Sequence, residues 1–206
     1  MLNNSVDEYI NVFTFNKTRK KTLILIHGLF GNAGFWLAFL KSFDDFKVLI
    51  FDINYPKLLL ENLEEINLSD FISLLLKDEK DIFIISHSMG TLLAKYFPSE
   101  KIKISFEICP IYMSVKKNKK QFINEVNSLS NYRNDEINNI LKNASFFLSI
   151  NYHFKKEDIQ IKKYIPINDV YFDNSLIKEA EYFEGDHFNI VSSIKMIYEH
   201  INNFFI

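Results

Sequence analysis

Short apolar runs alternate along the chain with longer segments in which apolar residues recur every three or four positions. The runs have the length of β-strands, and they occupy residues 9–15, 22–26, 47–53, 81–85 and 103–109. The segments with helical spacing lie at residues 34–42, 60–76, 89–97 and from 189 onward. This alternation predicts an α/β fold in which helices flank a mostly parallel central sheet.

The rhythm of the sheet is lost between residues 111 and 163, where the chain is polar, helix-prone and rich in Lys and Asn. We expect this stretch to form a small helical lid, with residues 1–110 and 164–206 making the two parts of one core. Strand-like residues return at 167–172 and 181–184, ahead of the last helix. The prediction is therefore a single domain with one insertion.

Composition limits the functions that are open to this domain. Of its 206 residues, 48% are hydrophobic and 16% are aromatic, which is enough for a buried core. The net charge of -2 lacks the basic excess of a nucleic-acid-binding protein, and the single cysteine, Cys109, excludes an intramolecular disulfide or a multi-cysteine metal site. No apolar run approaches the roughly 20 residues of a spanning helix, and the N-terminus lacks the features of a signal peptide. We expect a cytoplasmic protein with no membrane span, nucleic-acid partner, cofactor or metal.

The strongest candidate for chemistry is the run Ser86-His87-Ser88-Met89-Gly90, which directly follows one predicted strand and directly precedes a predicted helix. A nucleophile elbow needs this context, because its tight turn requires small residues two positions before and two after the nucleophile. Ser86 and Gly90 meet that requirement, so Ser88 is the candidate nucleophile. An ordinary strand-to-helix turn would fit the same short pattern.

A second turn, His27-Gly28-Leu29-Phe30-Gly31, follows the predicted strand at 22–26. The carboxyl ends of the strands are where α/β folds place their active sites. There the backbone N–H groups of Leu29 and Met89 could hold the oxyanion of a tetrahedral intermediate. The occurrence of both turns in this order favours the catalytic interpretation over two unrelated turns.

A serine hydroxyl is a poor nucleophile near neutral pH unless an imidazole takes its proton. His187, just before the last predicted helix, is the candidate base. His87 adjoins the serine, and neighbouring side chains at a strand end point apart, which argues against it. His27 is expected to order the oxyanion turn instead.

The carboxylate that orients the base should lie between the nucleophile and the histidine, in the loop after the penultimate strand. Asp173 follows the apolar run at 167–172 and is the first choice, with Asp169 and Asp158 as rivals. The alternative interpretation of Asp173 is a residue that caps the turn before Ser175.

These residues together resemble the α/β-hydrolase superfamily, in particular its esterase and thioesterase branch. The resemblance covers residues 20–110 and 165–190, and it rests on the two turns, on Trp36 and on the strand that ends at Asp52. It implies a cofactor-free carboxylic ester hydrolase acting on a small acyl ester, with Ser88, His187 and Asp173 as its catalytic triad. The family usually has glycine at the position of Ser86 and a glycine-rich turn where this chain has residues 52–56.

The segment at residues 184–188 and the chain length are similar to those of the small esterases that demethylate pimeloyl-carrier-protein methyl ester in biotin synthesis. The lysines within residues 116–120 could then receive an acidic acyl carrier protein, although a solvated helix face would look the same. Phe146 and Phe147 could line an acyl channel or pack in the core. A thioesterase with the same residues and a catalytically idle protein that binds a small ligand or partner are the alternatives.

Overall fold

A seven-stranded sheet runs through the protein, whose computed structural model describes residues 8–60, 68–111, 115–116, 118–129, 133–151, 159–175 and 177–203. Its strand order is β1-β3-β2-β4-β5-β7-β9. The first five strands along the chain are β1 (Ile10–Phe15), β2 (Lys21–Ile26), β3 (Phe46–Ile53), β4 (Ile82–His87) and β5 (Ile102–Ile108). The last two are β7 (Ile161–Pro166) and β9 (Ala180–Phe183). β1 is antiparallel to β3 and the other neighbouring strands are parallel, which confirms the predicted fold class.

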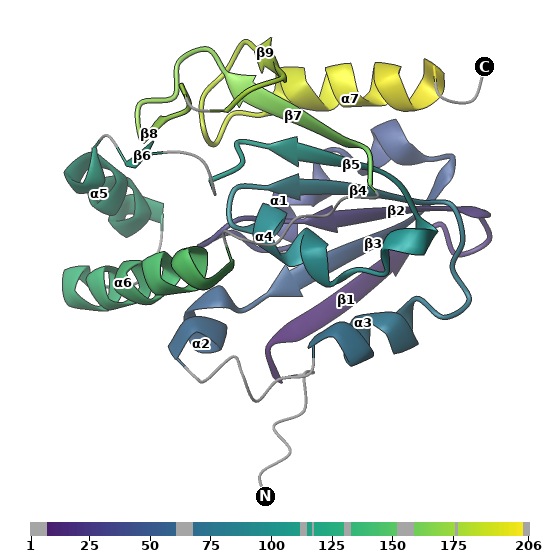
Figure 1. Ribbon diagram of the computed structural model, residues 1–206, viewed down its shortest axis with the longest axis horizontal. Helices are drawn as coiled ribbons and strands as arrows, with labels where there is room; N and C mark the ends of the chain where they lie inside the picture. The colour runs from purple at the N-terminus through teal and green to yellow at the C-terminus, as the bar shows by residue number, and fades with distance from the viewer. Residues whose placement is uncertain are drawn as a thin grey trace, which may run out of the picture.

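Helices cover both faces of this sheet (Figure 1). One face carries α1 (Gly34–Leu37), the 3₁₀ turn η2 (Leu40–Phe43) and α7 (Val191–Asn203). The other carries α2 (Tyr55–Leu60), α3 (Leu68–Leu75), α4 (Gly90–Leu93) and the 3₁₀ turn η4 (Ala94–Tyr96). A third 3₁₀ turn, η5 (Ser99–Lys101), leads into β5. The segments predicted as helices at 34–42 and 89–97 are thus each a short α-helix with a 3₁₀ turn close behind it.

The alternation of side chains along each strand divides the buried residues into two cores. Leu23 and Leu25 of β2 pack with Trp36 and with the buried stripe of α7. Ile24 and Ile26 point to the opposite face and pack against α2, α3 and α4. The continuous apolar run of β2 is therefore explained by burial on both faces, which the parallel sheet requires.

Between β5 and β7 the chain forms two helices, α5 (Lys119–Leu129) and α6 (Asn134–Asn151). Figure 1 shows both beyond the ends of the parallel strands, to the left of the sheet. Val126, Ile137 and Leu141 form a small core of their own between the two helices. A second, two-stranded sheet pairs β6 (Val115–Lys116) with β8 (Phe172–Asp173) and ties the start of this insertion to the chain that follows β7.

The penultimate strand of the large sheet lies earlier than the sequence pattern suggested. The predicted strand at 167–172 is a loop followed by the short β8, whereas β7 occupies Ile161–Pro166. The partly exposed Lys162 and Lys163 interrupt the apolar character of β7, which hides it from a search for continuous runs. This shift also moves the loop that follows β7, and so changes which aspartate that loop carries.

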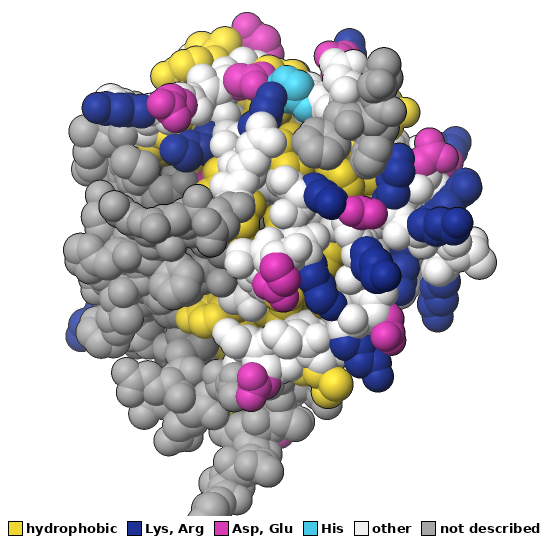
Figure 2. Space-filling model, turned by 45° about the vertical axis from the view of Figure 1, so that its right-hand side comes forward, with side chains coloured by type: hydrophobic (Ala, Val, Ile, Leu, Met, Phe, Trp, Pro, Cys, Tyr) yellow, Lys and Arg dark blue, Asp and Glu magenta, His cyan; other side chains and the backbone are white. Residues whose placement is uncertain are grey.

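Several ion pairs lie at the amino-terminal edge of the sheet, where the parallel strands begin. Lys103 lies 3.0 Å from Asp81, and Lys47 forms a close pair with Glu79. Figure 2 shows Lys and Arg side chains on the right of the face drawn there, with Asp and Glu side chains among them. An exposed pair such as Lys103–Asp81 contributes little stability, up to about 1 kcal/mol, whereas the Lys47–Glu79 pair is partly buried.

Candidate active site

Ser88 sits in a sharp turn between β4 and α4. Its φ is +52°, a left-handed conformation that non-glycine residues seldom adopt. The Ser88 N–H donates to the Ile108 carbonyl at 2.9 Å, while the Thr91 hydroxyl donates to the Ser88 carbonyl at 2.7 Å. One hydrogen bond from the Ser88 backbone thus goes to β5 and one comes from α4, and together they hold the strained turn in place. The turn places the serine at the carboxyl edge of the sheet.

Gly28 and Gly90 allow the turn at residues 27–31 to lie directly against the turn of Ser88. A Cβ atom on Gly90 would lie 2.6 Å from the His27 carbonyl oxygen, and one on Gly28 would lie 2.9 Å from the Ser88 Cβ. Both separations are closer than ordinary packing permits. The predicted oxyanion turn (residues 27–31) and the predicted nucleophile turn (residues 86–90) thus touch, and their contact depends on the absence of a side chain at Gly28 and Gly90.

The structure brings His187 and Ser88 together, although they are 99 residues apart in the chain. The imidazole Nε2 lies 2.9 Å from the Ser88 Oγ. His187 lies in the loop between β9 and α7, and both side chains are buried. This distance is within hydrogen-bond reach and suits transfer of the serine proton to the ring.

Asp169, in the loop after β7, pairs with the other side of the same ring, where its Oδ2 lies 3.2 Å from His187 Nδ1. Its Oδ1 accepts the backbone N–H groups of Tyr171 and Phe172 at 2.9 and 3.0 Å, and the Asn174 amide donates to Oδ2. Burial raises the pKa of Asp169, but the hydrogen bond and charge of His187 and the two backbone donors outweigh it, so that the pKa lies below its usual value.

An ionised Asp169 fixes the tautomer of the histidine. A carboxylate can only accept, so the His187 Nδ1 must carry the proton and donate it. In the neutral ring Nε2 then has a free lone pair, and the Ser88 hydroxyl donates to it. We call Ser88, His187 and Asp169 the Ser-His-Asp chain.

Asp173 does not hold the position beside His187 that was predicted for it. It lies in β8, and its Oδ1 accepts the N–H of Ser175 at 3.0 Å, as the turn-capping interpretation proposed. The choice of Asp173 followed from placing the penultimate strand at 167–172. With that strand at Ile161–Pro166, the rule that the acid follows it leads to Asp169. Asp158, the other rival, lies outside the described residues.

The two amides predicted for the oxyanion hole belong to residues that adjoin the close contact between Gly28 and Ser88. Met89 follows Ser88 directly, and Leu29 follows Gly28, which touches the serine turn. Among the described residues, neither the Leu29 nor the Met89 N–H donates a hydrogen bond. Two free donors beside a nucleophile are what an oxyanion hole provides.

Residues 52–56 support the predicted oxyanion turn through hydrogen bonds. The Tyr55 hydroxyl donates to the His27 carbonyl at 2.9 Å, and the Ile53 N–H donates to His27 Nε2 at the same distance. Asp52 accepts the Ala33 N–H at 2.8 Å. His27 therefore orders this turn, and the sequence alone did not reveal the contributions of Tyr55 and Asp52.

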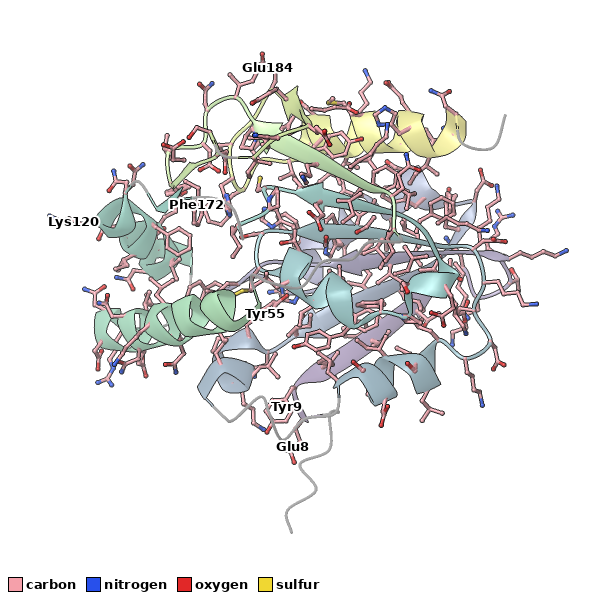
Figure 3. All side chains as sticks on the ribbon, in the orientation of Figure 1. Glu8, Tyr9, Tyr55, Lys120, Phe172 and Glu184 are labelled. Carbon is pink, nitrogen blue, oxygen red and sulfur yellow. The ribbon has the colours of Figure 1, made fainter. Side chains whose placement is uncertain are left out.

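Aromatic side chains surround the imidazole and connect it to α5. The ring of Phe172 lies 4.7 Å from that of His187, centroid to centroid, and Figure 3 shows Phe172 near the insertion. Phe122 of α5 stacks on Phe188 at 6.3 Å and contacts Tyr171 edge-on at 5.7 Å. The Tyr171 hydroxyl also donates to Glu125 of α5. The insertion thus contributes Phe122 to an aromatic cluster in which Tyr171, Phe172 and Phe188 contact the histidine ring.

A cavity of about 260 Å³ adjoins the nucleophile turn. Leu29 and Phe30 of the oxyanion turn, Phe35, His87, Val126 of α5 and Phe188 line it, and most of that lining is apolar. Phe146 and Phe147, which were predicted to line an acyl channel or pack in the core, have side chains outside the described part.

His87, the residue before the nucleophile, is a buried neutral histidine. Its Nε2 lies 2.7 Å from the His187 carbonyl oxygen, and since a carbonyl only accepts, Nε2 carries the proton. Burial, with a further contribution from the nearby His187, lowers the pKa of His87 from 6.5 to about 3. The ring therefore stays uncharged over the pH range in which a free histidine becomes protonated.

This pKa predicts how stability depends on pH. Below the ordinary value of 6.5 the unfolded chain binds a proton at residue 87 that the folded protein does not bind, so stability falls as the pH drops toward 3. The loss is up to about 1.4 kcal/mol per pH unit, the limit for a single proton. Urea unfolding at several pH values between about 6.5 and 4.5 measures it, and His87→Gln, which cannot be protonated, should show a shallower slope. Equal slopes in the two proteins would contradict the prediction.

Of the lysines within residues 116–120, the structure describes the side chain of Lys120 alone. It is exposed on α5 and points away from the sheet (Figure 3). Within the described ranges, no three His, Cys, Asp or Glu side chains are grouped so that they could hold a metal ion. None of the helices in those ranges is long and apolar enough to span a membrane.

Comparison with solved structures identifies the fold. The chain is similar to a lipase-esterase related protein from Clostridium acetobutylicum (16% identity, 95% of this chain and 99% of that one, TM-score 0.59). It is also similar to carboxylesterase CesB from Bacillus subtilis (11%, 95% and 87%, TM-score 0.61) and to the NocB thioesterase domain of the nocardicin cluster (11%, 95% and 99%, TM-score 0.62). No family model and no curated protein matches the sequence. The chain has the α/β-hydrolase fold, with a serine in the turn after β4.

Proposed function

We propose that the protein is a carboxylic ester hydrolase that forms an acyl-enzyme on Ser88. The observation that carries the proposal is the Ser-His-Asp chain, in which distances of 2.9 and 3.2 Å link the hydroxyl, the imidazole and a buried carboxylate. The two free amides of Leu29 and Met89 supply the second requirement, donors for the oxyanion. A mere ligand-binding protein would need neither.

The first half of the reaction transfers the acyl group. Ser88 Oγ attacks the ester carbonyl carbon while its proton moves to His187 Nε2, and the Leu29 and Met89 N–H groups hold the oxygen that becomes negative. Asp169 stabilises the imidazolium through Nδ1–H. His187 then gives the proton to the leaving alkoxide oxygen, the carbon–oxygen bond breaks, and an alcohol departs.

The second half repeats these steps with water. The oxygen of a water molecule attacks the acyl carbon while His187 takes a proton from that water. The tetrahedral intermediate then collapses, and His187 passes the proton to Ser88 Oγ. The acid leaves and the serine hydroxyl is restored. Atoms and charges balance without a cofactor or metal.

The test is hydrolysis of aryl esters together with labelling by a fluorophosphonate, which reacts with activated serines. The proposal requires turnover and one label per chain at Ser88, located by mass spectrometry. If neither turnover nor labelling is observed, the alternative of a catalytically idle protein that binds a small ligand would be favoured. Matched oxygen and sulfur esters of one acyl group, compared by kcat/KM, decide between an esterase and a thioesterase.

We further propose that the cavity beside Ser88 takes a short, uncharged acyl chain. Its volume of about 260 Å³ is below the about 300–1,000 Å³ of pockets that hold drug-sized ligands, and there is no Lys, Arg, Asp or Glu among the described residues that line it. We expect kcat/KM for butyryl aryl esters to exceed that for decanoyl esters by about tenfold or more.

Replacing Val126, the residue of α5 in the cavity wall, tests this assignment. Val126→Ala should move the preferred acyl chain to a longer one, because it removes two methyl groups from the wall. Val191→Ala makes the same chemical change at a position that is 61% exposed and serves as the control. An unchanged chain-length profile in Val126→Ala would place the acyl group elsewhere.

A proposal that competes with the short acyl chain concerns a longer acyl chain carried by a protein. The likeness of residues 184–188 to pimeloyl-carrier methyl esterases, and the exposed Lys120 on α5, support a methyl ester on an acidic acyl carrier protein. Hydrolysis of such an ester and rescue of a biotin-requiring strain would support it. Activity on small esters without rescue would restrict the function to those esters.

A further inference from the structure

We propose that His87 is a positioning residue that holds the His187 backbone so that its imidazole reaches Ser88. The inference rests on the proposed function, because it assigns a second histidine to the same reaction. His87, the last residue of β4, bonds to the backbone carbonyl of His187, and Ser88, the next residue, bonds to its imidazole. Ser88 Oγ contacts the imidazole at 2.9 Å, and His87 Nε2–H donates to the carbonyl oxygen at 2.7 Å.

Among the described residues, few other hydrogen bonds join the loop that carries His187 to the sheet, although Ile190 of the same loop packs in the core. Its own turn is closed locally, because Asp186 accepts the N–H groups of Phe188 and Asn189. At the His187 carbonyl, the structure describes one further neighbour besides His87, the Cys109 Sγ at 3.9 Å. A thiol is a weak donor at that distance. The bond from His87 is therefore the short contact that joins this carbonyl to the strand bearing the nucleophile.

The His87 ring is itself fixed. It stacks on Phe35 with a centroid distance of 5.0 Å and an interplanar angle of 24°, and its side chain is buried. It also stays neutral, so it remains a one-proton donor to the carbonyl and adds no positive charge next to His187. Asp169 sets the tautomer of the base, and His87 sets the location of its backbone.

Two substitutions separate the hydrogen bond from the ring. His87→Phe keeps an aromatic ring for Phe35 but has no donor, whereas His87→Gln has an amide N–H that can reach the same carbonyl. We expect kcat on an aryl ester to fall by about 10- to 100-fold in His87→Phe, which is the effect of displacing a base by a fraction of an ångström to one ångström. His87→Gln should recover most of kcat. Cys109→Ala, which removes the weak neighbour of the same carbonyl, is the matched control and should lose less than about threefold.

Fluorophosphonate labelling distinguishes positioning from folding. A positioning role slows labelling in His87→Phe but leaves its end-point near one label per chain, because every molecule still has an intact Ser88. A structural role lowers the end-point, since part of the protein is not competent. A lowered end-point, a wild-type rate in His87→Phe, or no recovery in His87→Gln would each overturn the inference. A wild-type protein without turnover or labelling would instead refute the proposed function.

Discussion

Ser88→Ala is expected to abolish ester hydrolysis while leaving the fold intact. Without the hydroxyl no acyl-enzyme can form, and kcat should fall by about 10⁵-fold or more. The alanine fits where the serine is, because the substitution removes one oxygen whose described partner is His187 Nε2. Initial rates on the best aryl ester, together with thermal unfolding of both proteins, provide the measurement.

The control is Ser86→Ala, a second buried serine in the same turn. Its Oγ lies 3.4 Å from the Phe106 carbonyl, a long contact outside the Ser-His-Asp chain. We expect its activity to remain within about threefold of the wild type. Substantial hydrolysis by Ser88→Ala would mean that another residue is the nucleophile, and the mechanism would then be wrong.

Asp169→Asn is expected to lower kcat by about 10³- to 10⁴-fold with little change in KM. Asparagine has nearly the same shape, and its oxygen can still accept from Tyr171 and Phe172. Its amide can instead donate to His187 Nδ1, which would shift the ring proton to Nε2. The imidazole could then no longer accept the proton of Ser88.

The matched control for this variant is Asp173→Asn, the same change four residues along the chain. Its carboxylate oxygen accepts the Ser175 N–H, which an asparagine oxygen can also do. We expect Asp173→Asn to stay within about threefold of the wild type in kcat/KM. The reverse result, with Asp173→Asn inactive and Asp169→Asn active, would restore the aspartate chosen from the sequence and refute the one chosen from the structure.

Local patterns in the sequence were sufficient for most of the sheet. The apolar runs of β2, β3 and β4 predicted strands because burial on both faces demands continuous hydrophobic residues. Small residues around Ser88 predicted its turn, since strand and helix would collide otherwise. The turn at His27 to Gly31 was recognised from its glycines at the end of a predicted strand, and the structure adds that Gly28 lies where the two turns touch.

The assignment of the acid needed the tertiary structure. β7 has lysines at 162 and 163, so its pattern is weak, and the error of about six residues in its position carried over to the aspartate. The sequence offered three candidate aspartates and ranked Asp173 first, because that residue follows the apolar run at 167–172. Only the folded loop shows Asp169 beside His187 and Asp173 capping a turn.

The sequence by itself determined the order of the strands along the chain, the tight turns and the residue types able to act as nucleophile and base. Those features follow from short-range sterics and from the period of the apolar residues, which are properties of neighbours in the chain. The tertiary structure decided which distant groups meet: Asp169 with His187, His87 with a carbonyl 100 residues away, and α5 with the aromatic residues over the site. Such contacts depend on how loops from separate strands pack at one edge, and no local pattern records that packing.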